Sequence, residues 1–109
     1  IPYLGVAAHI DWAEKNPKTV EKLYAAYKDA SVWITANPDE AAKVILPKGT
    51  PEDHKAIAEL IRANNRLGMN VRWASDVRKE INSVYQAGKA IAHFPSDPSP
   101  ATIYQAPGK

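Results

Sequence analysis

The sequence predicts a mainly α-helical chain of four to five helices with one short strand at its N-terminus. Apolar residues recur at helical spacing over residues 17–36 and 76–92, as on the buried face of an amphipathic helix. The apolar stretch PYLGVAA, residues 2–8, suits a strand. Three helix starts share one pattern, a capping residue directly before a proline: Asn16-Pro17, Asn37-Pro38 and Thr50-Pro51.

The N-terminal segment is expected to be extended and then to turn into a short helix. Residues 2–8 are too short and too continuously apolar for an amphipathic helix, and Pro2 favours an edge position. A helical turn over about 11–15 follows, with Asp11 as its capping residue. Pro17 ends this turn, because the residue before a proline avoids helical backbone angles.

The longest helix is predicted over residues 17–36. Asn16 is expected to cap it, and Pro17 takes the first position, where its missing N–H has no partner to lose. One face of the helix is mainly apolar, and we expect this face, with Trp33 beside it, to pack in a core. Its members are Val20, Leu23, Tyr24, Tyr27, Ser31 and Ile34.

Three further helices are predicted over about 38–46, 51–64 and 76–92. Asn37 and Glu40 have the spacing of a capping box, while Thr50 and Ser75 are expected to cap the other two helices. The residues expected to face the core are Ala41, Ala42, Ile45, Ala56, Ile57, Leu60, Ile61, Val77, Ile81, Val84, Tyr85 and Ile91. A proline-rich tail, residues 93–109, must lie on the protein or remain mobile.

Composition restricts the class of protein. The 109 residues suffice for one domain, and no apolar run approaches the 18 residues of a membrane span. Cysteine is absent, which excludes disulfides, thiolate metal sites and cysteine nucleophiles. No leader peptide is visible, but the chain begins with Ile-Pro, so we expect the coding sequence to continue upstream.

A single strand poses a hydrogen-bonding problem. Its edges leave N–H and C=O groups unpaired, and several wide apolar helix faces also need covering. We therefore interpret residues 1–109 as a single C-terminal fragment of an α/β protein whose other strands lie elsewhere. We also expect the fragment to self-associate through its open edge and uncovered apolar faces.

Residues 3–46 resemble the C-terminal part of periplasmic substrate-binding proteins of ABC importers, of the nitrate, sulfonate and taurine type. The segment 80–91, EINSVYQAGKAI, is similar to the final helix of that family. The residues that match the family pattern are Asn16, Pro17, Val20, Trp33, Ile34, Asn37, Pro38, Glu40, Ala41 and Ala42. The resemblance covers most of the chain and is strongest over residues 11–46.

This resemblance implies a two-lobed α/β fold, the type II periplasmic-binding fold, with a ligand cleft between the lobes. It implies a non-enzymatic, periplasmic or extracytoplasmic solute-binding component that hands a small nutrient to an ABC permease in the membrane. No cofactor and no nucleic-acid partner is expected. Because the family's ligand contacts come mostly from an earlier part of the chain, the resemblance transfers almost no binding residues.

Three residues are candidates for ligand contact: Tyr3, His9 and Trp73. His9 follows the predicted strand and could face a cleft, although a surface or capping role also explains it. Trp73 lies in a loop beside Arg72 and could be exposed for recognition or packed beneath the loop. No metal site is expected, because the three histidines are scattered. No catalytic motif is present, and the acidic pair Glu52-Asp53 suits the positive end of a helix dipole.

Two other functions remain open. The chain could be a free-standing helical module that binds a protein or nucleic acid through its basic residues, although Asp76 and Glu80 interrupt their run. These basic residues are Arg62, Arg66, Arg72, Arg78 and Lys79. It could also be an enzyme related to thiamine-precursor synthases, which the absence of a His-rich or Cys-rich patch disfavours.

Overall fold

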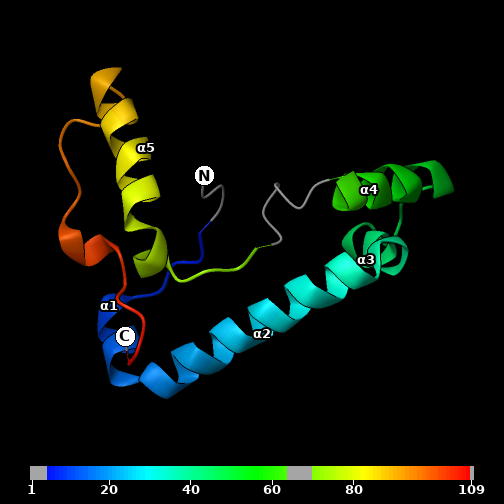
Figure 1. Cartoon of the computed structure of the whole chain (residues 1–109), viewed down its shortest axis with the longest axis horizontal. Helices are drawn as coiled ribbons and strands as arrows, with labels where there is room; N and C mark the ends of the chain where they lie inside the picture. Colours follow the sequence, from blue (N-terminus) through cyan, green and yellow to red (C-terminus); the bar gives the residue numbers. More distant parts are fainter. Residues whose placement is uncertain (1–4, 64–69, 109) are drawn as a thin grey trace. The chain divides into compact units, whose positions relative to one another are not determined.

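A computed structural model of the chain describes residues 5–63 and 70–108 (Figure 1). These residues are mainly helical, which confirms the predicted class, and they contain no strand. Contacts divide the chain into unit 1, formed by Ile1–Glu21 and Arg72–Lys109, and unit 2, formed by Lys22–Val71. The elements are α1 (Ile10–Lys15), α2 (Pro17–Ala36), α3 (Pro38–Ile45), α4 (Pro51–Ala63), η1 (Ala74–Val77), α5 (Arg78–Ala90) and η2 (Pro100–Thr102), where η marks a 3-10 helix.

The predicted N-terminal strand is wrong for the part that the structure describes. Residues 5–8 have no regular structure and are exposed, while residues 2–4 lie outside the described residues. A strand is stable only when a second strand pairs with its N–H and C=O groups. The described part of the chain offers no such strand.

The two Asn-Pro junctions join helices differently from the prediction. Asn37 Nδ2 donates to Trp33 O at 3.0 Å, and Asn16 Nδ2 donates to Trp12 O at 2.8 Å, so each amide caps the helix that ends. The Asn37 side chain makes no cap bond to α3. A proline cannot donate an N–H to the last carbonyls of the preceding helix, so the asparagine before it supplies donors instead. Its backbone carbonyl then accepts the first bond of the next helix, as from Ala41 N at 2.8 Å.

The capping box occurs at the start of α4 and not at the start of α3. Thr50 N donates to Asp53 Oδ2 at 2.9 Å, and Asp53 N donates to Thr50 Oγ1 at 3.1 Å. The two bonds satisfy two N–H groups that the first helical turn leaves without partners. The hydrogen bonds from Thr50, first from its backbone and then from its side chain, lower the pKa of Asp53 below its ordinary value. The predicted partner at the start of α3, Glu40, instead pairs with Lys43.

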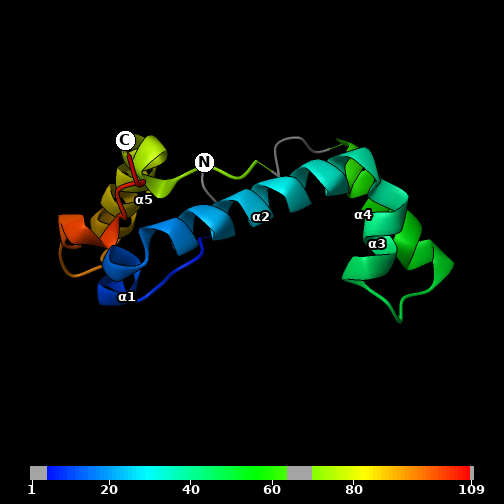
Figure 2. The same ribbon diagram turned by 90° about the horizontal axis from the view of Figure 1, so that it is seen from below.

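Unit 2 is held together by close packing of α3 against α4, which lie side by side in both views (Figures 1 and 2). The contact is lined mainly by small side chains, because Ala41, Ala42 and Ala58 are buried together with Ile61. Alanine allows two helix backbones to approach closely. The prediction for Ala56 was wrong: it is exposed, and Ala58 faces the contact. Leu60 and Ile45, also predicted to be buried, are exposed as well.

Unit 1 contains α5 and the tail that follows it. The helix predicted over 76–92 begins as η1, whose Val77 is buried, and continues as α5. At its end, His93 N donates to Gly88 O at 2.8 Å and Ala92 N donates to Lys89 O at 3.0 Å. These two bonds form a Schellman motif, in which the residue after the helix adopts left-handed backbone angles. Here that residue is Ala92, with φ of 60°.

Replacing Ala92 with glycine is expected to stabilise the end of α5. Left-handed backbone angles cost an alanine energy because of its Cβ, and glycine adopts them without that penalty. We expect the free energy of unfolding to rise by roughly 0.5–1 kcal/mol, less the extra entropy of glycine in the unfolded chain. Urea unfolding followed by circular dichroism measures this change. The matched control is Ala90→Gly, inside the helix, which should destabilise by about as much.

The proline-rich tail lies on unit 1. Lys89 Nζ and Gln86 Nε2 both donate to Asp97 Oδ1 at 3.0 Å. Further along, Ala106 is buried, and its N–H donates to Ser75 Oγ at 3.1 Å. Ser75 therefore holds the tail. The sequence had predicted that Ser75 caps the last helix, and this prediction is wrong. The sequence left open whether the tail lies on the protein or remains mobile. The described tail residues lie on unit 1.

The longest helix, α2, packs closely on no other described element of unit 2. Its Leu23, Tyr27 and Trp33 side chains are 46%, 48% and 44% exposed. Its one buried residue is Ser31. The prediction that Tyr27 and Trp33 pack in a core is therefore wrong, because the described residues bring no apolar layer against them. Among those residues, no large side chain is fully buried.

Candidate functional site

An open hollow of unit 2 lies where α2 passes into α3, and it is also lined by Arg62 near the C-terminal end of α4. It is an open depression of about 540 Å³. Its polar lining comes from Thr35, Asn37, Asp39, Glu40 and Arg62, with the smaller Ala36 and Pro38 between them. The Asn37-Pro38 junction positions this lining, because it ends α2 and starts α3 within two residues.

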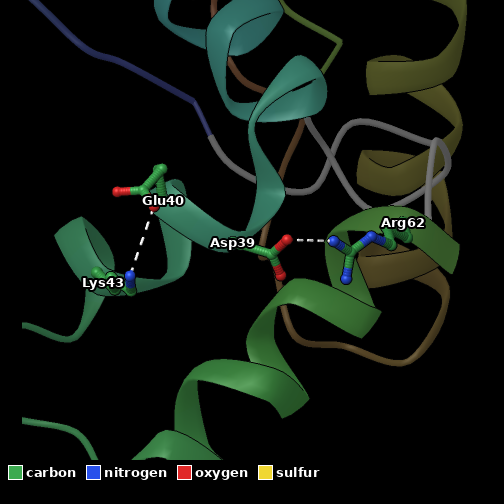
Figure 3. Close-up of polar contacts among 4 residues, drawn as sticks. All are labelled: Asp39, Glu40, Lys43 and Arg62. Atoms are coloured by element: carbon green, nitrogen blue, oxygen red, sulfur yellow. Dashed lines mark hydrogen bonds and ion pairs between the residues drawn. The ribbon is translucent and has the colours of Figure 1, made fainter.

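An ion pair between Asp39 and Arg62 crosses the depression (Figure 3). Arg62 Nη2 lies 2.5 Å from Asp39 Oδ2, and the two side chains are 51% and 67% exposed. A second pair, Lys43 with Glu40 at 3.4 Å, lies within α3. Exposed pairs of this kind contribute about 0–1 kcal/mol, because water and salt screen them. The Asp39–Arg62 pair therefore adds little to the stability of the α3–α4 packing.

A second depression, of about 290 Å³, shares Asp39 with the first. Lys43, His54 and Lys55 line it together with Pro51. His54 Nε2 lies 2.7 Å from Leu46 O, and since a carbonyl can only accept, this ring nitrogen donates. His54, predicted only as a scattered histidine, thus caps the end of α3 from within α4.

The chemistry of the two depressions is that of hydrated, mixed charges. Cationic side chains lie beside Asp39 in both of them, so a ligand with an anionic group could exchange with the carboxylate. Ligand pockets usually enclose most of a small molecule within apolar walls, which these open, polar hollows do not provide. The arrangement supports loose electrostatic contact, and the described side chains around it form no nucleophile–base pair.

The three candidates for ligand contact are not gathered in one hollow. Tyr3 lies outside the described residues. His9 precedes α1 and is exposed, and its carbonyl accepts from Ala13 N at 3.0 Å. Trp73 is half-buried, with its ring 6.4 Å from that of Tyr104 at an angle of 45°. Of the two roles open for Trp73, packing beside the loop is the one its surroundings favour.

The basic residues are divided between the two units. Arg62 pairs with Asp39 in unit 2, whereas Arg78 in unit 1 donates to Ile103 O at 3.4 Å and to Gln105 Oε1 at 3.2 Å. Arg72 and Lys79, also in unit 1, are exposed, and Arg66 lies outside the described residues. Two of the five basic side chains therefore hold the chain's own structure. Across residues 5–63 and 70–108, no three His, Asp or Glu side chains are grouped to hold a metal ion.

The Asp97 contacts are expected to make attachment of the tail dependent on pH. Hydrogen bonds from Lys89 and then Gln86, together with the positive charge of Lys89, lower the pKa of Asp97 below its ordinary value of 3.8. A lowered folded-state pKa means that these contacts stabilise the fold above the unfolded pKa and are lost as the pH falls through the folded pKa. We therefore expect the tail to loosen below pH 3.8. An NMR titration that follows the signals of the Phe94 ring, three residues before Asp97, measures this change.

The control for this titration is Asp97→Asn, which keeps a hydrogen-bond acceptor but removes the charge. It should abolish the Phe94 transition below pH 3.8 and leave the helix content of α5 unchanged. An equal transition in the variant would show that another acid governs the tail.

Comparison with protein-family models, curated proteins and solved structures found no match to the chain. Over the part that the structure describes, no helix combines the length and the apolar content that a bilayer span requires.

Proposed function

We propose that this chain forms part of the solute-binding component of an ABC importer. In this role the protein captures a small nutrient, such as nitrate, taurine or another sulfonate, and delivers it to a membrane permease from outside the cytoplasm. It carries out no reaction and needs no cofactor. The proposal is supported by the residues over 11–46 and 80–91 that resemble this family, and by the helical character of both segments.

The observation that carries the proposal is the apolar surface that the helices leave open. Leu23, Tyr27 and Trp33 on α2 are exposed, as are Val44 and Ile45 on α3. Helices with such faces are stable in proteins when the faces cover a sheet or other helices. In a two-lobed α/β protein, helices of this kind form the outer layer of a lobe, and the missing cover is the sheet beneath.

The test combines uptake and binding. Disruption of the encoding gene is expected to abolish uptake of one labelled solute from a set containing nitrate, taurine, an alkanesulfonate and a thiamine pyrimidine precursor. The protein purified from the intact gene should gain thermal stability with the same solute, because a ligand that binds only the folded state stabilises it. Unchanged uptake of every solute, with no thermal shift, would contradict the proposal.

A helical module that binds nucleic acid is the alternative, and the structure offers it less support. The side chains of Arg62 and Arg78 already contact groups of their own unit. If this function were correct, duplex binding by the chain would weaken steeply with salt, because each phosphate contact releases counterions. Catalytic turnover by the purified protein would instead favour the enzyme related to thiamine-precursor synthases.

A further inference from the structure

The longest helix carries a stripe with the spacing of a coiled coil. Leu23, Tyr27, Ala30 and Ile34 follow one another at intervals of 4, 3 and 4 residues, and Val20 lies 3 residues before Leu23. Alternating intervals of 3 and 4 keep a stripe facing a second helix along its length. We call Leu23, Tyr27, Ala30 and Ile34 the heptad stripe.

The structure leaves Leu23, Tyr27 and Ala30 of the heptad stripe exposed, with Ile34 half-buried, and covers a neighbouring edge of the helix. Tyr24 Oη and Lys28 Nζ both donate to Val71 O, at 3.4 and 3.1 Å, beside the buried Ser31. Leu23 and Tyr27 are about half exposed, and Ala30 is exposed as well. Unit 2 therefore covers the more polar edge of α2 and leaves the apolar edge in water, which is the unfavourable arrangement for a lone helix.

The flanks of the heptad stripe present no charge that would repel a second copy. The positions beside it are taken by Tyr24, Ala26, Ser31 and Trp33, all uncharged. The charged residues of the helix lie at positions away from the stripe: Lys18, Glu21, Lys22, Lys28 and Asp29. The partner that fits this surface is another apolar helix of the same spacing.

We propose that two copies of the chain pair through the heptad stripes of their α2 helices, antiparallel and related by a two-fold axis. In this orientation the large Tyr27 of one copy packs against the small Ala30 of the other, and Leu23 packs against Ile34. A parallel pair would instead place Tyr27 against Tyr27 and Ala30 against Ala30, which crowds one layer and leaves a void in the next. The pairing is isologous, so it closes as a dimer.

This inference does not rest on the proposed function. In an importer component the same stripe would be covered within the protein itself, whereas the dimer concerns the chain of 109 residues. A monomeric chain would overturn the dimer and leave the importer proposal standing. Unchanged solute uptake would contradict the importer proposal and leave the dimer standing.

The test is the molar mass of the chain by sedimentation equilibrium over a wide range of concentration. We expect a mass that rises towards twice 12.0 kDa. The double variant Leu23→Glu/Tyr27→Glu should weaken association at least tenfold, and the milder Leu23→Ala/Tyr27→Ser should weaken it less while keeping the helix. The matched control, Ala25→Glu/Val32→Glu, alters exposed residues on the other side of α2 and should dimerise like the wild type. A wild-type monomer at all concentrations, or equal association of all variants, would overturn the proposal.

The orientation has its own readout, because the chain contains no cysteine. An equimolar mixture of Tyr27→Cys and Ala30→Cys chains is expected to form the mixed disulfide, identified by mass spectrometry. Disulfides formed within each variant alone, at the expense of the mixed species, would overturn the antiparallel arrangement.

Discussion

Replacing Ala58 with leucine is expected to destabilise unit 2 by about 1–3 kcal/mol. Ala58 is 1% exposed and lies in the contact of α3 with α4, where Ala41 and Ala42 are also buried. The three additional carbons of leucine would push the two helices apart or adopt a strained rotamer. Urea unfolding followed by circular dichroism measures the loss.

Ala56→Leu is the matched control for this change. It lies two residues away in the same helix, receives the same side chain and is exposed. Because surface substitutions usually change stability by less than about 0.5 kcal/mol, we expect unfolding close to that of the wild type. Equal losses for Ala56→Leu and Ala58→Leu would mean that α3 and α4 do not pack through their alanines.

Gly88→Ala is expected to destabilise unit 1 although alanine is the better helix former. A Cβ on Gly88 would overlap two atoms of the Phe94 ring, which would have to leave its place against Tyr85. These two rings lie 5.5 Å apart, edge to face. Loss of that contact and of the burial around it outweighs the gain of about 1 kcal/mol in helix propensity, for a net loss of about 1 kcal/mol.

The same substitution should have the opposite sign once the ring is removed. In a Phe94→Ala background, Gly88→Ala meets no ring and keeps only the gain in helix propensity, about 1 kcal/mol of stabilisation. The double-mutant cycle therefore predicts a coupling of about 2 kcal/mol between positions 88 and 94. Thermal unfolding of the four proteins measures it. A stabilising Gly88→Ala in both backgrounds would mean that Phe94 does not pack on Gly88.

The helix starts were the part of the fold that local sequence predicted best. α2, α3 and α4 begin at Pro17, Pro38 and Pro51, as expected from the capping residues before them. The proline signal is local, because it depends on a fixed φ and a missing N–H and not on distant neighbours. The direction in which Asn37 bonds was missed, because a capping side chain can serve either the helix before it or the one after it.

The candidate site was not predicted, and its residues show why. Asp39 and Arg62 are 23 positions apart, and nothing in either local pattern indicates that they form an ion pair. Two other contacts likewise depend on which distant segments the fold brings together. These are the hydrogen bond of His54 to Leu46 O and that of Lys89 to Asp97. Even within α4, helical spacing alone did not separate the exposed Ala56 from the buried Ala58, because both positions carry the same residue.

Sequence by itself determined that this protein is built of helices and where most of them begin, because capping and proline geometry act within a few residues. Only the tertiary structure decided which faces are covered. It buried alanines between α3 and α4, placed the tail on α5 and left Leu23, Tyr27 and Ala30 of the heptad stripe exposed. Burial depends on what other parts of the chain bring to a surface, and that information is not contained in the helix that carries the surface.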